Sequence, residues 1–101
     1  MLEKDITAAI LRYLRSLPEC FCWKEHGGTY GTAGIPDIIC CYRGRFLGLE
    51  VKQPGNKMTR LQEVTLERIR AALGEAHIVT GVAQVRGIIE KIQKEDRCHD
   101  S

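Results

Sequence analysis

The sequence predicts an α/β fold in which helices flank a central mixed β-sheet. Three stretches repeat apolar residues at spacings of three and four, as amphipathic helices do, and four short runs are β-branched or alternate between apolar and polar residues, as strands do. In chain order they read helix, three strands, helix, strand, helix. The length of 101 residues suits one domain with a single core. We expect that domain over residues 1–93 and a frayed tail over residues 94–101, whose charges leave no apolar face.

The first helix is predicted over residues 2–17, where Ile6 and Ile10 mark the buried face and Pro18 follows the end. Glu3 lies three residues before Ile6 and therefore projects from the core-facing side, whereas Asp5 faces away by helical phase. An acid in the first turn also favours the positive end of the helix dipole, so Glu3 has a purely structural explanation as well.

A short strand is predicted over residues 20–25, followed by a glycine-rich loop over residues 26–34. We expect Trp23 in the core; an exposed Trp23 would instead be a platform for base stacking. The glycine spacing of the loop matches neither a P-loop nor a dinucleotide fingerprint. His26 is expected on the surface, and either His26 or Glu25 would serve only as an accessory polar group.

The next stretch predicts a hairpin, with strands over residues 38–42 and 46–53 and a tight turn at residues 43–45. Pro36 can precede a strand because it has no ladder hydrogen to donate. In the second strand the alternation predicts one apolar face, and Glu50 and Lys52 lie together on the other. Asp37 opens the neighbouring strand, so an antiparallel hairpin brings its carboxylate near Glu50.

Two carboxylates held so close repel each other unless a positive group lies between them. A hard divalent cation with oxygen ligands meets this requirement, and Mg²⁺ is commonly held by one or two carboxylates, several waters and a substrate phosphate. The Val51 carbonyl is a further candidate ligand, because the peptide between Glu50 and Lys52 must pass the metal. Lys52 would stand beside the cation, where it can orient an attacking water or steady a phosphate.

The remaining elements are a turn-rich connection over residues 53–58, a helix over residues 59–73, a strand over residues 77–80 and a helix over residues 82–91. Thr59 and Gln62 have the spacing of a capping box, which explains Gln62 without any active site. Gly74 follows the second helix as a breaker.

At these residues the sequence resembles the PD-(D/E)XK nucleases, and within them the VRR-NUC branch. The matching residues occur in the order of that branch: Gly34-Ile35-Pro36-Asp37, Gly44-Arg45, Glu50-Val51-Lys52 and Thr59-Arg60-Leu61-Gln62. The resemblance covers residues 3–89. It implies a restriction-endonuclease-like fold and a DNA endonuclease that uses Mg²⁺ or Mn²⁺. It further implies Asp37, Glu50, Lys52 and Gln62 as catalytic residues, and Glu3 as a metal ligand beside Asp37, Glu50 and Val51.

Six charged residues lie from Arg43 to Arg60, and we expect them to flank this site or belong to it. Five of the six are basic. We expect Arg43, Arg45, Lys57 and Arg60 to hold the phosphate backbone of DNA, with Tyr30 of the glycine-rich loop approaching the substrate phosphates. The alternative is a solvated hairpin edge kept soluble by its charges.

The resemblance also implies a preference for branched DNA such as a four-way junction, and a homodimer, because two symmetric nicks need two sites. A nucleic-acid-binding or partner-binding module that keeps the fold without cutting is the alternative. A third reading is a zinc-thiolate protein built on Cys20, Cys22, Cys40 and Cys41, although their spacing does not favour it. No signal peptide or membrane span is apparent, so we expect the cytoplasm of a bacterial or phage-infected cell.

Overall fold

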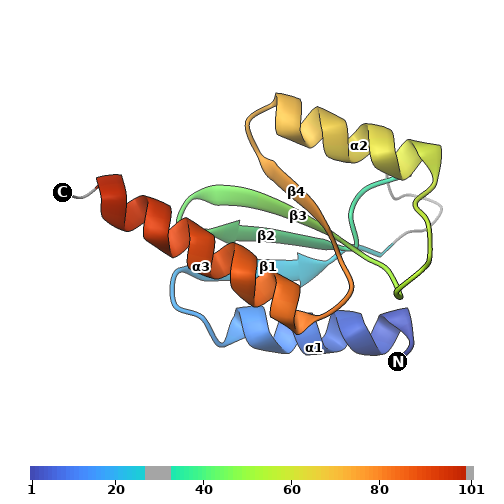
Figure 1. Cartoon of the computed structure of the whole chain (residues 1–101), viewed down its shortest axis with the longest axis horizontal. Helices are drawn as coiled ribbons and strands as arrows, with labels where there is room; N and C mark the ends of the chain where they lie inside the picture. Colours follow the sequence, from blue (N-terminus) through green and yellow to red (C-terminus); the bar gives the residue numbers. More distant parts are fainter. Residues whose placement is uncertain (27–32, 100–101) are drawn as a thin grey trace.

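A computed structural model describes residues 1–26 and 33–99 of the chain. Its elements follow the predicted order: α1 Glu3–Arg15, β1 Cys20–Lys24, β2 Ile38–Tyr42, β3 Arg45–Val51, α2 Arg60–Ala71, β4 Glu75–Val79 and α3 Val82–His99 (Figure 1). The predicted boundaries of β2 are met to the residue. The other predicted boundaries differ by at most two residues, except the end of the last helix. No helix of the described part is both long and apolar enough to cross a membrane.

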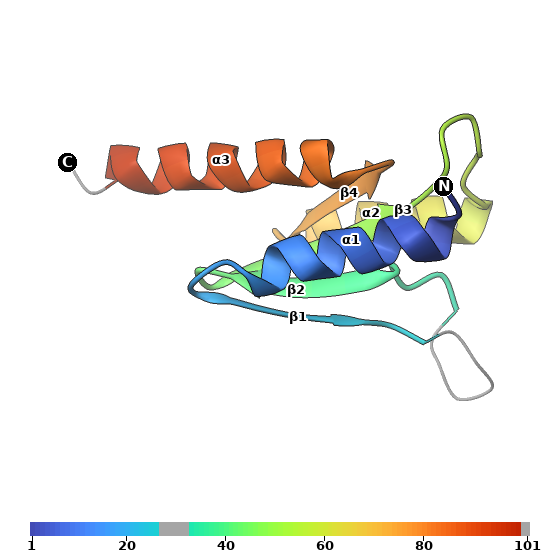
Figure 2. The same ribbon diagram turned by 90° about the horizontal axis from the view of Figure 1, so that it is seen from below.

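The four strands form one mixed sheet in the order β1-β2-β3-β4. The β1–β2 and β2–β3 pairs are antiparallel, and β3–β4 is parallel. The parallel pair follows from the connection through α2, since a parallel return needs a crossover of a dozen or more residues. Two helices, α1 and α3, cover one face of the sheet (Figure 2). The predicted α/β class with a mixed central sheet is confirmed.

The main core lies between that face and the helices α1 and α3. Leu47, Leu49 and Val51 point into it from β3, as the alternation predicted, and meet Ile10 of α1 and Ile89 of α3. Each of these five side chains is at most 1% exposed. The opposite face of β3 is therefore free for Glu50, at the end of the strand.

Helix α2 covers only part of the opposite face. Its Ile69 lies over Gly48 of β3, where an added Cβ would be 3.2 Å from the Ile69 Cδ1 and 3.0 Å from the Pro36 Cγ. This close approach requires glycine at position 48. Figure 1 shows α2 beside β4 and far from β1, so the outer part of this face, over β1 and β2, has no helix above it.

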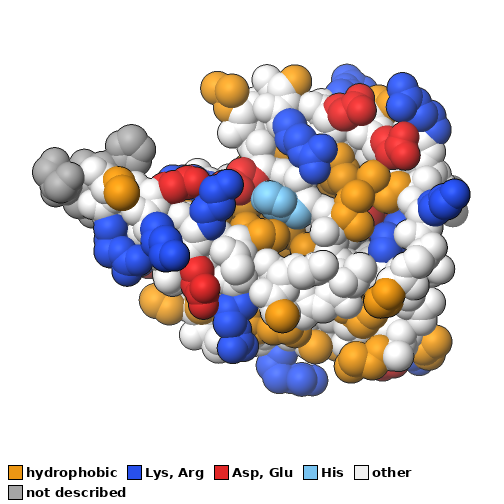
Figure 3. Space-filling model, viewed as in Figure 1, with side chains coloured by type: hydrophobic (Ala, Val, Ile, Leu, Met, Phe, Trp, Pro, Cys, Tyr) orange, Lys and Arg blue, Asp and Glu red, His pale blue; other side chains and the backbone are white. Residues whose placement is uncertain are grey.

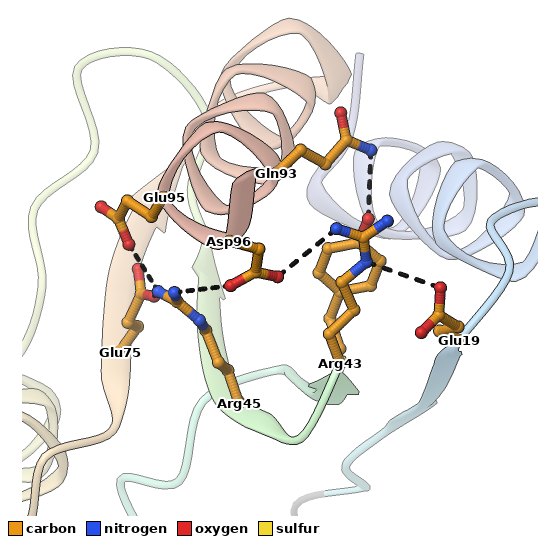
Figure 4. Close-up of polar contacts among 8 residues, drawn as sticks. Glu19, Arg43, Arg45, Glu75, Gln93, Glu95 and Asp96 are labelled. Atoms are coloured by element: carbon orange, nitrogen blue, oxygen red, sulfur yellow. Dashed lines mark hydrogen bonds and ion pairs between the residues drawn. The ribbon is translucent and has the colours of Figure 1, made fainter. Parts of the chain in front are cut away.

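The prediction of a frayed tail over residues 94–101 is wrong for residues 94–99, which continue α3. The reason is tertiary. Arg45 at the start of β3 donates to Glu95 at 2.6 Å and to Asp96 at 3.0 Å, and also pairs with Glu75 of β4 at 3.4 Å (Figure 4). The acidic side chains of Glu95 and Asp96 are thus bound by Arg45 of β3, which lies about 50 residues earlier in the chain.

The expectation that Trp23 belongs to the core is also wrong. Its side chain is 40% exposed, and that of Phe21 is 69% exposed. Both project from the sheet face opposite to α1, because the intervening Cys22 points toward α1 and is buried.

Candidate active site

The open end of the β2–β3 hairpin brings Asp37 and Glu50 together. Asp37 directly precedes β2, whose first residue Ile38 pairs with Leu49 of β3. The backbone N–H of Val51 donates to Asp37 Oδ2 at 2.7 Å, which fixes this carboxylate against the end of β3. The predicted convergence of the two acids is therefore what the hairpin register produces.

Glu50 is 2% exposed, and its Oε1 has no hydrogen-bond partner. Burial, a hydrogen bond with Asp37 and the negative charge of Asp37 together raise the pKa of Glu50 to about 8, while the positive charge of Lys52 acts in the opposite direction. The positive charge of Lys52, two residues along the chain, thus favours the ionised form of the Glu50 carboxyl. A buried acid with one orphaned oxygen is costly to ionise unless a cation is bound.

Gln62 serves the helix cap and the acid site at once. Its Oε1 accepts from the Thr59 backbone N–H at 2.9 Å, and Thr59 Oγ1 accepts from the Gln62 N–H at 3.2 Å, which completes the predicted capping box. Its Nε2 points at Glu50 Oε2 across a longer distance of 3.5 Å. The structural and functional interpretations of Gln62 are therefore compatible, since the amide oxygen and nitrogen take separate roles.

Glu3 reaches the same site from α1. Its negative charge contributes to the raised pKa of Glu50, and its Oε2 accepts from Asn56 Nδ2 at 3.1 Å. Asp5, two residues on, is exposed. Glu3 is therefore partly buried and held by Asn56, and its role as a metal ligand stays a prediction.

Sequence reasoning missed the part that Asn56 and Gln53 play in this arrangement. Gln53 Nε2 donates to the Met1 carbonyl at 2.7 Å, and Asn56 binds both Gln53 and Glu3. The turn closed by Asn56 N–H and the Gln53 carbonyl therefore ties the start of α1 to the end of β3. The turn composition of residues 53–56 was recognisable, but partners more than 50 positions away leave no local signal.

The predicted DNA-binding residues fall into three groups. Arg43 and Arg45 lie at the turn of the hairpin, about 16 Å along the strand from Glu50, so the expectation that they flank the acids is wrong. Both are engaged in ion pairs there, Arg43 with Glu19 and Asp96 (Figure 4). Lys57 and Arg60 are exposed beside the start of α2, at the end of the molecule that carries the acids, and Tyr30 lies outside the described residues.

Figure 3 shows Lys and Arg side chains along the edge where the starts of α1 and α2 meet the β3–α2 connection. This edge contains the acid site. Basic side chains are thus exposed near the buried Glu50, and acidic side chains lie among them over α2 (Figure 3).

A zinc site built on all four strand cysteines is excluded by the faces they occupy. Cys20, Cys22 and Cys40 belong to the core side, whereas Cys41 is exposed on the other face. The Sγ atoms of Cys20 and Cys40 are 3.5 Å apart.

The donor set of the acid site suits a hard divalent cation. Its side chains offer carboxylate oxygens and no sulfur or imidazole, which favours Mg²⁺ or Mn²⁺ over zinc. Within residues 1–26 and 33–99 no three His, Cys, Asp or Glu side chains converge closely enough to enclose an ion by themselves. Any divalent ion here would therefore need waters or a substrate phosphate among its ligands.

No family model and no curated protein matches the sequence. Solved structures do match the fold. One, named "VRR_NUC domain", superposes with a TM-score of 0.72 at 23% identity and covers 87% of this chain and 94% of its own. Another, named "VRR_NUC domain protein", gives a TM-score of 0.67 at 18% identity and covers 89% of this chain and 86% of its own. The chain therefore has the fold of a VRR_NUC domain.

Proposed function

We propose that the chain is a VRR-NUC nuclease, an endonuclease that hydrolyses phosphodiester bonds in DNA with Mg²⁺ or Mn²⁺. The observation that carries the proposal is the buried Glu50 carboxyl, whose Oε1 has no hydrogen-bond partner, beside Asp37. A cation at this point would remove the cost of ionising Glu50, and the fold is that of structures named for a nuclease domain.

In this proposal Asp37, Glu50 and Glu3 supply carboxylate oxygens and Val51 supplies its carbonyl to the metal. A metal bound there would polarise the scissile phosphate and lower the pKa of a coordinated water. Asp37 already accepts a hydrogen bond from the Val51 N–H, which holds its carboxylate in one orientation. Gln62 holds the Glu50 carboxylate from the α2 side.

Lys52 is proposed to position the attacking water or steady the phosphate. Support for this role comes from its position directly after β3 and from its positive charge, which acts to lower the pKa of Glu50. Lys57 and Arg60 are proposed to bind the DNA backbone without reading bases. Tyr30 is proposed as a phosphate contact because the glycine-rich loop that contains it lies just before Asp37 in the sequence. Arg43 and Arg45 are not proposed to bind DNA, because ion pairs with acids already engage both.

We further propose a substrate of branched DNA and a homodimer that places one site on each of two strands of a junction. Two symmetric cuts require two sites related by a two-fold axis. The chain matches 94% and 86% of the length of the two VRR_NUC structures, so the comparison involves domains of similar size.

The test is an incubation of purified protein with end-labelled four-way junction, 5′ flap, duplex and single-stranded DNA, each with Mg²⁺, Mn²⁺ or EDTA. We expect paired cuts in the junction that EDTA, Asp37→Asn and Lys52→Ala each abolish, a loss of at least about a hundredfold. Asp5→Asn is the matched control, because Asp5 is an exposed acid in the first turn of the same helix as Glu3. Full activity of either site variant would overturn the assignment.

The alternative, a module that binds nucleic acid without cutting, makes a distinct prediction. Junction binding without cleavage in either metal would favour it. Against it stands the burial of Glu50 beside Asp37, since a binding surface has no physical need to bury an acid.

A further inference from the structure

The sheet face that carries Glu50 also carries two exposed aromatic side chains of β1. Trp23 pairs with Ile39 of β2, which in turn pairs with Gly48 of β3, so these three residues form one row across the sheet. Two positions further along each strand come Glu25, Asp37 and Glu50. The aromatic row therefore adjoins the acid row, about 7 Å away along the strands.

The two rings are held in a defined arrangement. The centroids of Phe21 and Trp23 are 5.5 Å apart with an interplanar angle of 48°. Trp23 Nε1 donates to Glu25 Oε1 at 2.7 Å, which fixes the indole in relation to the acid row. Among the described residues no helix covers them, because α2 packs against β4 and α1 contacts β1 from the other face (Figures 1 and 2).

We propose that Phe21 and Trp23 form a stacking platform for unpaired bases of the DNA strand that enters the acid site. This inference deepens the proposed function, on which it rests, by assigning the substrate a single-stranded segment next to the cleaved bond. Every base has a π-face, so such stacking tolerates any sequence. The spacing of the rings suits consecutive bases of an extended strand.

The size of the aromatic surface favours a nucleic-acid strand over a second copy of the chain. Phe21, Trp23 and the neighbouring Phe46, which is 43% exposed, together present on the order of 300 Å² of ring surface. A stable protein interface needs about 800 Å² from each partner. The exposed area of two or three partly exposed aromatic rings matches the area of one or two stacked bases far better.

The chain contains one tryptophan, so intrinsic fluorescence reports on the platform directly. The experiment titrates full-length protein in EDTA with an oligothymidylate of 12 nucleotides and with a 12-base-pair duplex. We expect the single strand to quench Trp23 strongly and the duplex to do so weakly. Unchanged fluorescence when a labelled single strand is shown to be bound would overturn the proposal.

Variants then separate stacking from mere apolar contact, with affinity measured by anisotropy of the labelled strand. We expect Trp23→Ala and Phe21→Leu each to weaken single-strand binding at least about fivefold, and Phe21→Tyr to retain it. Leu73→Ala is the matched control, since Leu73 is an exposed apolar side chain beyond the end of α2. Both aromatic side chains are exposed, so melting curves should show intact folds, and Phe21→Leu carries the test if Trp23→Ala does not fold.

Two results would overturn the platform. The first is an equal affinity of Phe21→Leu and wild type for the single strand. The second is a dimer, seen in sedimentation, that Phe21→Leu converts to a monomer, which would assign this face to a second copy of the chain. Failure of the nuclease proposal has a different signature. Cleavage would then be absent with every metal, while single-strand binding in EDTA would still depend on Phe21 and Trp23.

Discussion

Among the acidic and basic side chains of the described residues, only Glu50 is buried. The hairpin forces this position, because Leu49 and Val51 must enter the core and the residue between them must point to the other face. There Asp37 and α2 surround it, and Gln62 gives it one long hydrogen bond. The metal-free protein therefore keeps a proton on Glu50 at pH values where an exposed carboxyl would have lost it.

Stability of the metal-free protein should consequently fall as pH rises. The pKa of Glu50 is raised from its ordinary 4.5 to about 8, so between these values the folded state holds a proton that the unfolded state has released. The free energy of unfolding then decreases across this window, on the order of a few kcal/mol in total. Urea denaturation in EDTA at pH 5, 6.5 and 8 measures the slope.

Glu50→Gln removes the titrating group and should flatten that dependence relative to wild type. Glu67→Gln, an exposed acid on α2, should leave the wild-type slope unchanged. Parallel pH profiles for wild type and Glu50→Gln would show that the Glu50 carboxyl ionises normally in the fold, and the argument for a cation at its orphaned oxygen would be lost.

At the scale of elements, the hairpin was readable from sequence and the end of α3 was not. Residues 38–42 are a local apolar run that opens after a proline, and both signals lie within the strand itself. Residues 94–99 carry charges whose partners, Arg43 and Arg45, belong to the hairpin. Local pattern cannot reveal such partners, so the same residues that looked solvated and frayed are helical.

The Arg45 cluster makes a prediction about this helix. Arg45→Ala removes ion pairs to Glu75, Glu95 and Asp96, and we expect a loss of about 1 kcal/mol, since these groups are about one-third exposed and screened by water. Hydrogen exchange should accelerate at residues 93–98 and remain unchanged in α1. DNA cleavage should stay at the wild-type level, because the cluster lies at the far end of the hairpin.

Arg68→Ala is the comparison, since Arg68 is an exposed arginine on α2. If Arg45→Ala instead reduced DNA affinity and its salt dependence while the helix stayed protected, the original expectation that this residue binds phosphates would be restored.

At the scale of the whole molecule, the acid site joins elements that are far apart in the chain. The sequence predicted that Asp37 and Glu50 meet, because both belong to one hairpin, and helical phase predicted only that Glu3 lies on the core-facing side of α1. It did not predict the fastening of α1 by Gln53 and Asn56, or the exposure of Trp23. Those depend on which surfaces α1 and α2 leave open, and that is decided by packing over the entire sheet.

A divalent ion at this site should therefore stabilise the whole fold rather than one loop. Ligands from α1, the start of β2 and the end of β3 would be cross-linked, and binding to the folded state alone raises stability by about 2.7 kcal/mol at a hundredfold excess over Kd. For a domain of 101 residues this corresponds to a rise in Tm of roughly 10–20 °C. Thermal melts with and without Mn²⁺ measure it.

The raised pKa of Glu50 also determines how this stabilisation by the ion depends on pH. Because Glu50 keeps its proton up to about pH 8, ion binding must displace it, and the Mn²⁺-induced rise in Tm should be larger at pH 8 than at pH 6. Asp37→Asn and Glu3→Gln should each diminish the rise, while Asp5→Asn should preserve it. If the rise in Tm were equal in Asp37→Asn and wild type, the ion would bind elsewhere, because the Asp37 carboxylate is the acid that a hydrogen bond fixes against β3. This conclusion would hold whether or not the protein cleaves DNA.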